Sequence, residues 1–128
     1  MRAAFAAVDA HARASSPQEC CGLLLGTANE ILDAVPAANL ALDPSRNFLI
    51  DPKAHIDARR AARERGLVIV GFYHSHPRSA PVPSAKDLAG ASYPGHWYLI
   101  VRPLATDCDA GLFRLEGEQF VRVDIEIG

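Results

Sequence analysis

Apolar residues near the N-terminus have the spacing of one helix face. Phe5, Val8 and Ala12 recur every three or four positions, and the residues between them are mostly small or charged. This pattern predicts an amphipathic helix that ends before Pro17. The uninterrupted apolar run, residues 3–8, is too short for a secretion signal.

Further along the chain, short apolar segments separated by glycine, proline and polar residues predict strands. The predicted strands are residues 19–26, 30–35, 47–50, 67–73, 97–102, 111–116 and 119–127. The first two strands, and likewise the last two, are joined by short turns and should form hairpins. Residues 67–73 are apolar on both alternating faces, which is typical of a central strand beneath a helix.

A second helix has clear start and stop signals. Asp51 is a suitable N-cap, Pro52 suits the first helical position, and Gly66 follows a basic last turn. A short third helix is predicted over residues 84–91. Three helices and six or seven strands predict an α/β (α+β) sandwich, a sheet covered by helices, in one domain spanning residues 1–128.

Composition and charge narrow the range of functions. The 128 residues are 49% hydrophobic and 22% charged, with 13 basic and 15 acidic side chains and a net charge of −2. This balance argues against a nucleic-acid partner, and no apolar run is long enough to span a membrane. Three cysteines cannot form a disulfide framework, so we expect a reducing, cytoplasmic location.

Two histidines follow the most apolar strand. His74 and His76 are two positions apart, so in an extended chain their side chains point to the same side. Imidazoles placed in this way can bind one metal ion through neutral nitrogens. An H-x-H pair is weak evidence alone, and the alternative is two ordinary polar histidines in a loop.

A serine and an aspartate follow at a spacing that supports the metal interpretation. Ser84 and Asp87 form a capping-box pattern ahead of Leu88, which is a structural role in itself. A capped helix directed at the strand end would also deliver the Asp87 carboxylate to the two histidines. Two His and one Asp leave zinc an open fourth position, as in catalytic rather than structural sites.

Glu19 is the candidate general base. It begins an otherwise apolar strand, where a carboxylate is difficult to explain by core packing. The alternative is an exposed glutamate at a strand end.

The order of these residues resembles a known motif. Glu19, H-S-H-P at 74–77 and P-S-A-K-D at 83–87 resemble the JAMM motif, also called MPN+ or JAB, of zinc metalloproteases. The resemblance implies a mixed, curved sheet of the JAMM/cytidine-deaminase-like type. It also implies one zinc per chain with a bound water, held by His74, His76 and Asp87. Glu19 would be the general base and then the acid, and Ser84 would stabilise the oxyanion.

The chain is most similar to compact prokaryotic members of this family. That similarity implies an isopeptidase or peptidase that cleaves after the Gly-Gly tail of a ubiquitin-like or sulfur carrier protein. The alternatives are a non-catalytic MPN-type module that binds ubiquitin-like partners, and an unrelated H-x-H metal protein. The sequence gives no oligomeric state.

The remaining candidate residues have structural interpretations. We expect one of Cys20 and Cys21 to pack inward, with Cys21 a minor candidate ligand, and Cys108 to lie in an exposed turn. His11 and His55 are expected to face solvent, and His96 to be structural. Trp97 and Phe113 are expected in the core or lining a groove.

Overall fold

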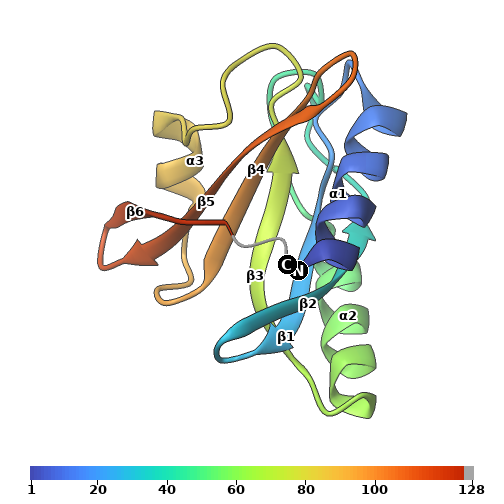
Figure 1. Cartoon of the computed structure of the whole chain (residues 1–128), viewed down its shortest axis with the longest axis vertical. Helices are drawn as coiled ribbons and strands as arrows, with labels where there is room; N and C mark the ends of the chain where they lie inside the picture. The colour runs from blue at the N-terminus through green and yellow to red at the C-terminus, as the bar shows by residue number, and fades with distance from the viewer. Residues whose placement is uncertain (126–128) are drawn as a thin grey trace.

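A six-stranded sheet organises the chain in the computed structural model, which describes residues 1–125 (Figure 1). The strands are β1 (Cys21–Thr27), β2 (Glu30–Ala37), β3 (Val68–Ser75), β4 (Trp97–Pro103), β5 (Cys108–Glu116) and β6 (Gln119–Val123). The helices are α1 (Arg2–Ser15), α2 (Pro52–Glu64) and α3 (Ala85–Gly90). The predicted helix-covered sheet is confirmed.

The sheet is mixed, with the order β2-β1-β3-β4-β5-β6. Neighbouring strands are antiparallel except β3 and β4, which are parallel. A parallel pair requires a crossover connection, and here the connection contains α3. The crossover starts directly after β3, so α3 can return to the end of that strand.

Two cores lie on opposite faces of the sheet, one beneath α1 and the other beneath α2. Helix α1 buries Ala4, Val8 and Ala12, and α2 buries Ala58 and Ala62. Alanine on the inner face of a helix lets its backbone approach the strands closely. Phe5, which was expected on the inner stripe of α1, is only partly buried.

The predicted boundaries of α2 are confirmed. The Asp51 side chain accepts the backbone N–H of Lys53 at 3.0 Å, and Pro52 occupies the first turn. Gly66 has φ +70°, a conformation that L side chains rarely adopt. Pro52 and His55, in the first turn of this helix, line the same cavity as His74.

Several strand predictions need correction. Residues 47–50 form no strand, and only an isolated bridge joins Asn39 to Ile50. Strand β2 continues through Pro36, which is tolerated because β2 is at the sheet edge. Strand β3 runs on to Ser75, so His74 is a strand residue. The strand predicted over residues 119–127 ends at Val123 in the structure. Residues 126 and 127 of that prediction lie outside the described residues.

No helix within residues 1–125 has the length and apolar character needed to cross a membrane.

Candidate metal centre

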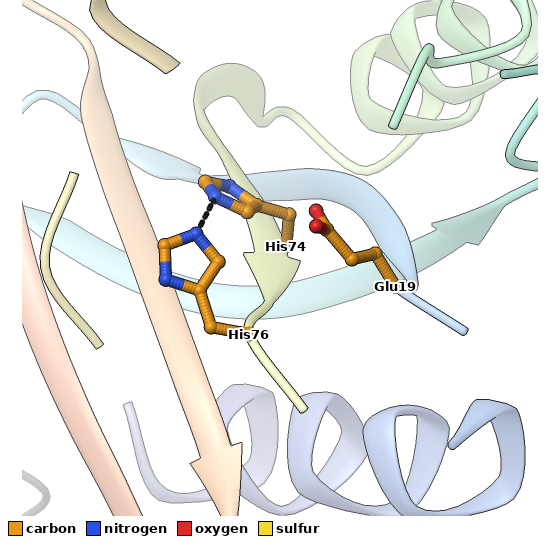
Figure 2. A group of neighbouring side chains, drawn as sticks. All are labelled: Glu19, His74 and His76. Atoms are coloured by element: carbon orange, nitrogen blue, oxygen red, sulfur yellow. Dashed lines mark hydrogen bonds between the residues drawn. The ribbon is translucent and has the colours of Figure 1, made fainter. Parts of the chain in front are cut away.

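Four of the predicted site residues come together at the end of β3. His74 is on β3, His76 follows it, Asp87 is on α3, and Glu19 lies just before β1. The register of β1 with β3 pairs Cys21 with His74, which explains why Glu19 reaches the histidines. Figure 2 shows the Glu19, His74 and His76 side chains converging.

Three electron-pair donors nearly touch. The Nε2 atoms of His74 and His76 are 3.1 Å apart, and Asp87 Oδ2 lies 3.2 Å from the first and 3.1 Å from the second. All three side chains are buried or nearly so. Such a triangle requires a positive charge at its centre, either a proton or a metal ion.

The surroundings fix which nitrogen of His76 faces the triangle. His76 Nδ1 lies 2.9 Å from the carbonyl oxygen of Ala80, and a carbonyl can only accept. His76 therefore donates Nδ1–H, and in the neutral ring Nε2 keeps a lone pair. Hydrogen bonding of the second nitrogen to a backbone carbonyl is the usual arrangement of a metal-binding histidine.

Asp87 is held by the predicted capping box. Ser84 Oγ accepts the Asp87 backbone N–H at 3.0 Å, and Asp87 Oδ2 accepts the Ser84 backbone N–H at 2.9 Å. Burial alone would raise the pKa of Asp87, but hydrogen bonds to His74 and His76 hold it below its ordinary value. The carboxylate is thus ionised and rigidly oriented.

The two histidines differ electrostatically. Burial lowers the pKa of His74 and favours its neutral form. Burial acts the same way on His76, but hydrogen bonds to Asp87 and to the Ala80 carbonyl outweigh it and raise the pKa.

The donor set fits a zinc ion. Tetrahedral zinc with ligands at 2.0–2.1 Å separates those ligand atoms by about 3.3 Å. The observed separations of 3.1–3.2 Å are close to that value. Two imidazoles and one carboxylate also match the ligand types of catalytic zinc sites.

Glu19 lies beside the triangle and is 9% exposed. A carboxylate oxygen of Glu19 and the histidine nitrogens lie within 4.8 Å of one another. Burial raises the pKa of Glu19 to about 7. A carboxyl group with this pKa can both accept and release a proton near neutral pH.

Asn39 and Ser75 position Glu19, and sequence reasoning identified neither. Asn39 Nδ2 donates to the Glu19 carbonyl at 3.0 Å, and its Oδ1 accepts the backbone N–H groups of Ala41 and Leu49. Ser75 Oγ accepts the Cys20 backbone N–H at 2.9 Å. The sequence signals are weak, because Asn39 lies in an aperiodic loop and Ser75 is the variable residue of H-x-H.

Phe48 stacks on the His74 ring. The ring centroids are 4.2 Å apart and the planes are inclined by 21°. Both residues line a cavity of about 550 Å³ that also contains Glu19, Asp87 and Ser84. The donor triangle is therefore at the wall of a space large enough for a ligand.

The structure corrects two predictions for histidines outside the triangle. His11 does not simply face solvent, because its Nδ1 lies 2.7 Å from the hydroxyl oxygen of Tyr73. His55 packs edge-on against Phe72 and lines the cavity. His96 stacks on Phe72, in line with its predicted structural role.

The three cysteines, Phe113 and Trp97 lie outside the donor triangle, and the contacts of those that are buried are structural. Cys20 and Cys21 are both buried, rather than only one of them, and Cys21 Sγ contacts the carbonyl oxygens of Ala37 and Ala38. In residues 1–125, the metal-ligand atoms that gather within 4.8 Å include no cysteine. Cys108 is half-buried and begins β5, so the prediction that it lies in an exposed turn is wrong. Phe113 is buried, and Trp97 packs against the core, as predicted.

A mixed sheet covered on both faces and an open His-His-Asp cluster beside a carboxylate define a candidate metallohydrolase. The family model described as "Prokaryotic homologs of the JAB domain" matches residues 1–114. The chain belongs to this family, the JAMM or MPN+ family that its motif resembles.

Two relatives have names that describe an activity. The chain is 44% identical over 89 residues to a protein named "Desampylase" from Haloferax volcanii, covering 68% of this chain and 64% of the relative. It is 33% identical over 84 residues to a "Probable TtuB-protein conjugate cleaving protease" from Thermus thermophilus, covering 66% and 56%. The matched regions span less than two thirds of the relatives' length.

Solved structures share the fold. Protein DSY2949 from Desulfitobacterium hafniense superposes with a TM-score of 0.85 at 30% identity, covering 95% of this chain and 86% of the other. AF2198, a JAB1/MPN domain protein from Archaeoglobus fulgidus, superposes with a TM-score of 0.61 at 20% identity, covering 98% and 94%. The second likeness shows the fold alone.

Proposed function

We propose that this protein is a zinc-dependent peptidase or isopeptidase that cleaves after the Gly-Gly tail of a ubiquitin-like or sulfur carrier protein. The observation that carries the proposal is the donor triangle of His74, His76 and Asp87, with separations of 3.1–3.2 Å. The Glu19 carboxyl group lies beside it, at the wall of a cavity of about 550 Å³.

The relatives' names support the substrate class. One relative is named a desampylase and another a probable protease that cleaves TtuB–protein conjugates. The proposal also places the protein in the cytoplasm, since Cys20, Cys21 and Cys108 are all free thiols.

In the proposed mechanism, His74, His76 and Asp87 hold one zinc ion. Zinc in such a site supplies Lewis acidity, which activates water and polarises the carbonyl of the bond to be cleaved. The chain's own contribution is orientation: the Ala80 carbonyl fixes the His76 ring, and the capping box fixes Asp87.

Glu19 transfers a proton from the attacking water to the leaving amine in this mechanism. Glu19 is buried beside the proposed zinc site, where it can accept a proton from the attacking water and then deliver it to the leaving amine. The second transfer is needed because an amine leaves far more readily when protonated. Its backbone is held by the Pro44 carbonyl and by Asn39, so the carboxyl group stays beside the triangle.

Ser84 stabilises the developing oxyanion in this mechanism. Its Oγ accepts one hydrogen bond, from Asp87 N–H, and its own O–H remains free to donate. A preorganised donor of this kind stabilises charge that develops only in the transition state.

The proposal is tested with a ubiquitin-like protein ending in Gly-Gly, joined either to a lysine side chain or to the N-terminus of a second protein. The zinc-loaded protein should release the ubiquitin-like protein with an intact Gly-Gly terminus, identified by mass spectrometry. Chelation should stop the reaction and added zinc should restore it. Tight binding of the conjugate without cleavage would instead identify a non-catalytic binding module.

A further inference from the structure

The cavity has a second part, which the proposed chemistry does not use. It is lined by five rings from four different elements and a loop, which we call the aromatic wall: His55, Phe72, Tyr93, Tyr98 and Phe120. Phe72 is central, with its ring centroid 4.9 Å from that of Tyr93, 5.5 Å from that of Tyr98 and 5.6 Å from that of His55. Phe120 extends the wall, 5.1 Å from Tyr98.

The aromatic wall presents ring surface rather than charge. The Tyr98 hydroxyl already accepts the backbone N–H of Tyr93 at 3.3 Å. Burial and the nearby Arg59 lower the pKa of His55, which favours its neutral ring. Of the charged lining residues, Asp87 is part of the donor triangle and Glu19 lies beside it, and Lys86 donates to Asn47 Oδ1 at 2.5 Å.

The wall is accessible mainly at Tyr93, because Phe72 and Tyr98 are only 7% and 8% exposed and form its inner side. Tyr93 is 42% exposed and lies in the connection between α3 and β4. A cavity of about 550 Å³ lies within the range that holds small organic ligands. Two glycines have no side chains, so a Gly-Gly tail leaves the wall uncovered.

Strand geometry relates the wall to the scissile bond. Phe72 precedes the proposed ligand His74 by two residues on the same face of β3, a distance of about 7 Å along the strand. In an extended substrate the residue before Gly-Gly also lies two positions, about 7 Å, from the glycine whose carbonyl is attacked. Its side chain can therefore reach the wall while that carbonyl lies at the triangle.

The part of the substrate on the amine side of the scissile bond fits the aromatic wall poorly. The departing amine is protonated and becomes a cation, which is unfavourable in an apolar compartment. It is better placed at the polar end of the cavity, beside Glu19.

We propose that the aromatic wall is a specificity subsite for a bulky apolar side chain on the substrate residue that immediately precedes Gly-Gly. This inference rests on the proposed function and adds a third residue to the recognised tail. Burying a large apolar side chain changes kcat/KM by about 10- to 100-fold.

The test compares three fluorogenic peptides of the form X-Gly-Gly-amide, in which X is Phe, Leu or Ala. The zinc-loaded wild type should prefer Phe and Leu to Ala by about 10- to 100-fold in kcat/KM. Tyr93→Ala removes an exposed part of the wall and should reduce that preference. Ala91→Trp places a large ring in the cavity and should reduce cleavage of the Phe and Leu peptides more than of the Ala peptide.

Ser92→Ala is the matched control, since Ser92 lines the same cavity but contributes no ring. Equal kcat/KM for the three peptides, or a preference that both variants leave unchanged, would overturn the subsite. If no peptide is cleaved, fluorescence-polarisation binding of the same peptides to the zinc-loaded protein decides the subsite, and the conjugate assay decides the proposed function separately. Tighter binding of the Phe peptide than of the Ala peptide, lost in Ala91→Trp, would support it; equal binding would refute it.

Discussion

Ser75 and Cys20 exchange two hydrogen bonds that join the end of β3 to the segment carrying Glu19. Ser75 Oγ accepts the Cys20 N–H at 2.9 Å, and Ser75 N–H donates to the Cys20 carbonyl at 3.1 Å. Ser75 lies between the two proposed histidine ligands, and Cys20 follows the proposed base. This residue pair, together with the hydrogen bonds of Asn39 and Pro44 to the Glu19 backbone, fixes the segment carrying the base relative to the metal centre.

The first prediction is that Ser75→Ala lowers both stability and turnover. It leaves the buried Cys20 N–H without a partner, which costs about 1–3 kcal/mol. Glu19 should also lose its fixed position, so kcat should fall while zinc content stays the same. Urea denaturation and steady-state kinetics measure the two effects. Ser45→Ala, which removes an exposed hydroxyl, is the control and should change neither.

The second prediction concerns the metal ligands. His76→Ala should lose zinc, because only His74 and Asp87 would remain in an open site. The fold should persist, since the site lies at a strand end and the two cores lie elsewhere. Elemental analysis and circular dichroism measure these outcomes. A full zinc content in purified His76→Ala would remove His76 from the ligand set.

The third prediction separates the two roles of Ser84. Ser84→Ala removes a helix cap, which costs about 1 kcal/mol of stability, and one oxyanion donor, which costs about 100- to 1,000-fold in kcat. Zinc should be retained, because Asp87 remains in place. Ser92→Ala, at another serine lining the cavity, should keep wild-type turnover. If Ser84→Ala also keeps wild-type turnover, Ser84 is a cap and nothing more.

The fourth prediction uses His11, which lies against Tyr73 on the face of the sheet beneath α1. Burial lowers the pKa of His11 in the folded protein, so the unfolded chain binds a proton more readily. Stability from this residue is therefore present above pH 6.5 and is lost as pH falls below it, by at most about 1.4 kcal/mol per pH unit. His11→Gln should flatten the pH dependence of unfolding free energy between pH 5 and 7 relative to wild type. An unchanged slope would show that His11 does not titrate differently on folding.

The sequence predicts the parts of this molecule that depend on local pattern. The helix cap at Asp51, the apolar central strand that leads to the two histidines, and the capping box of Ser84 and Asp87 are each encoded within a few neighbouring residues. The motif also predicted that His74, His76 and Asp87 would meet. Its spacing places the two histidines at the end of a strand and the aspartate on the helix of the following crossover.

The residues that support the site were not predictable, because their roles depend on tertiary contacts. Asn39 organises a loop without periodicity by bonding groups up to twenty positions away. Phe48 lies in a segment predicted as a strand, where nothing indicates that its ring would stack on His74. His55 is on a helix whose pattern does not show which side lies over Phe72.

The most direct test of the central claim is the Glu19→Gln variant, loaded with zinc and assayed on a conjugate of a ubiquitin-like protein with a Gly-Gly tail. Glutamine keeps the size and hydrogen bonding of the side chain but cannot accept a proton or deliver it to the leaving amine. We predict one zinc per chain and wild-type thermal stability, with cleavage reduced nearly to the level of the chelated enzyme. Cleavage at the wild-type rate, or loss of zinc from the variant, would contradict the assignment of Glu19 as a base beside a His-His-Asp metal centre.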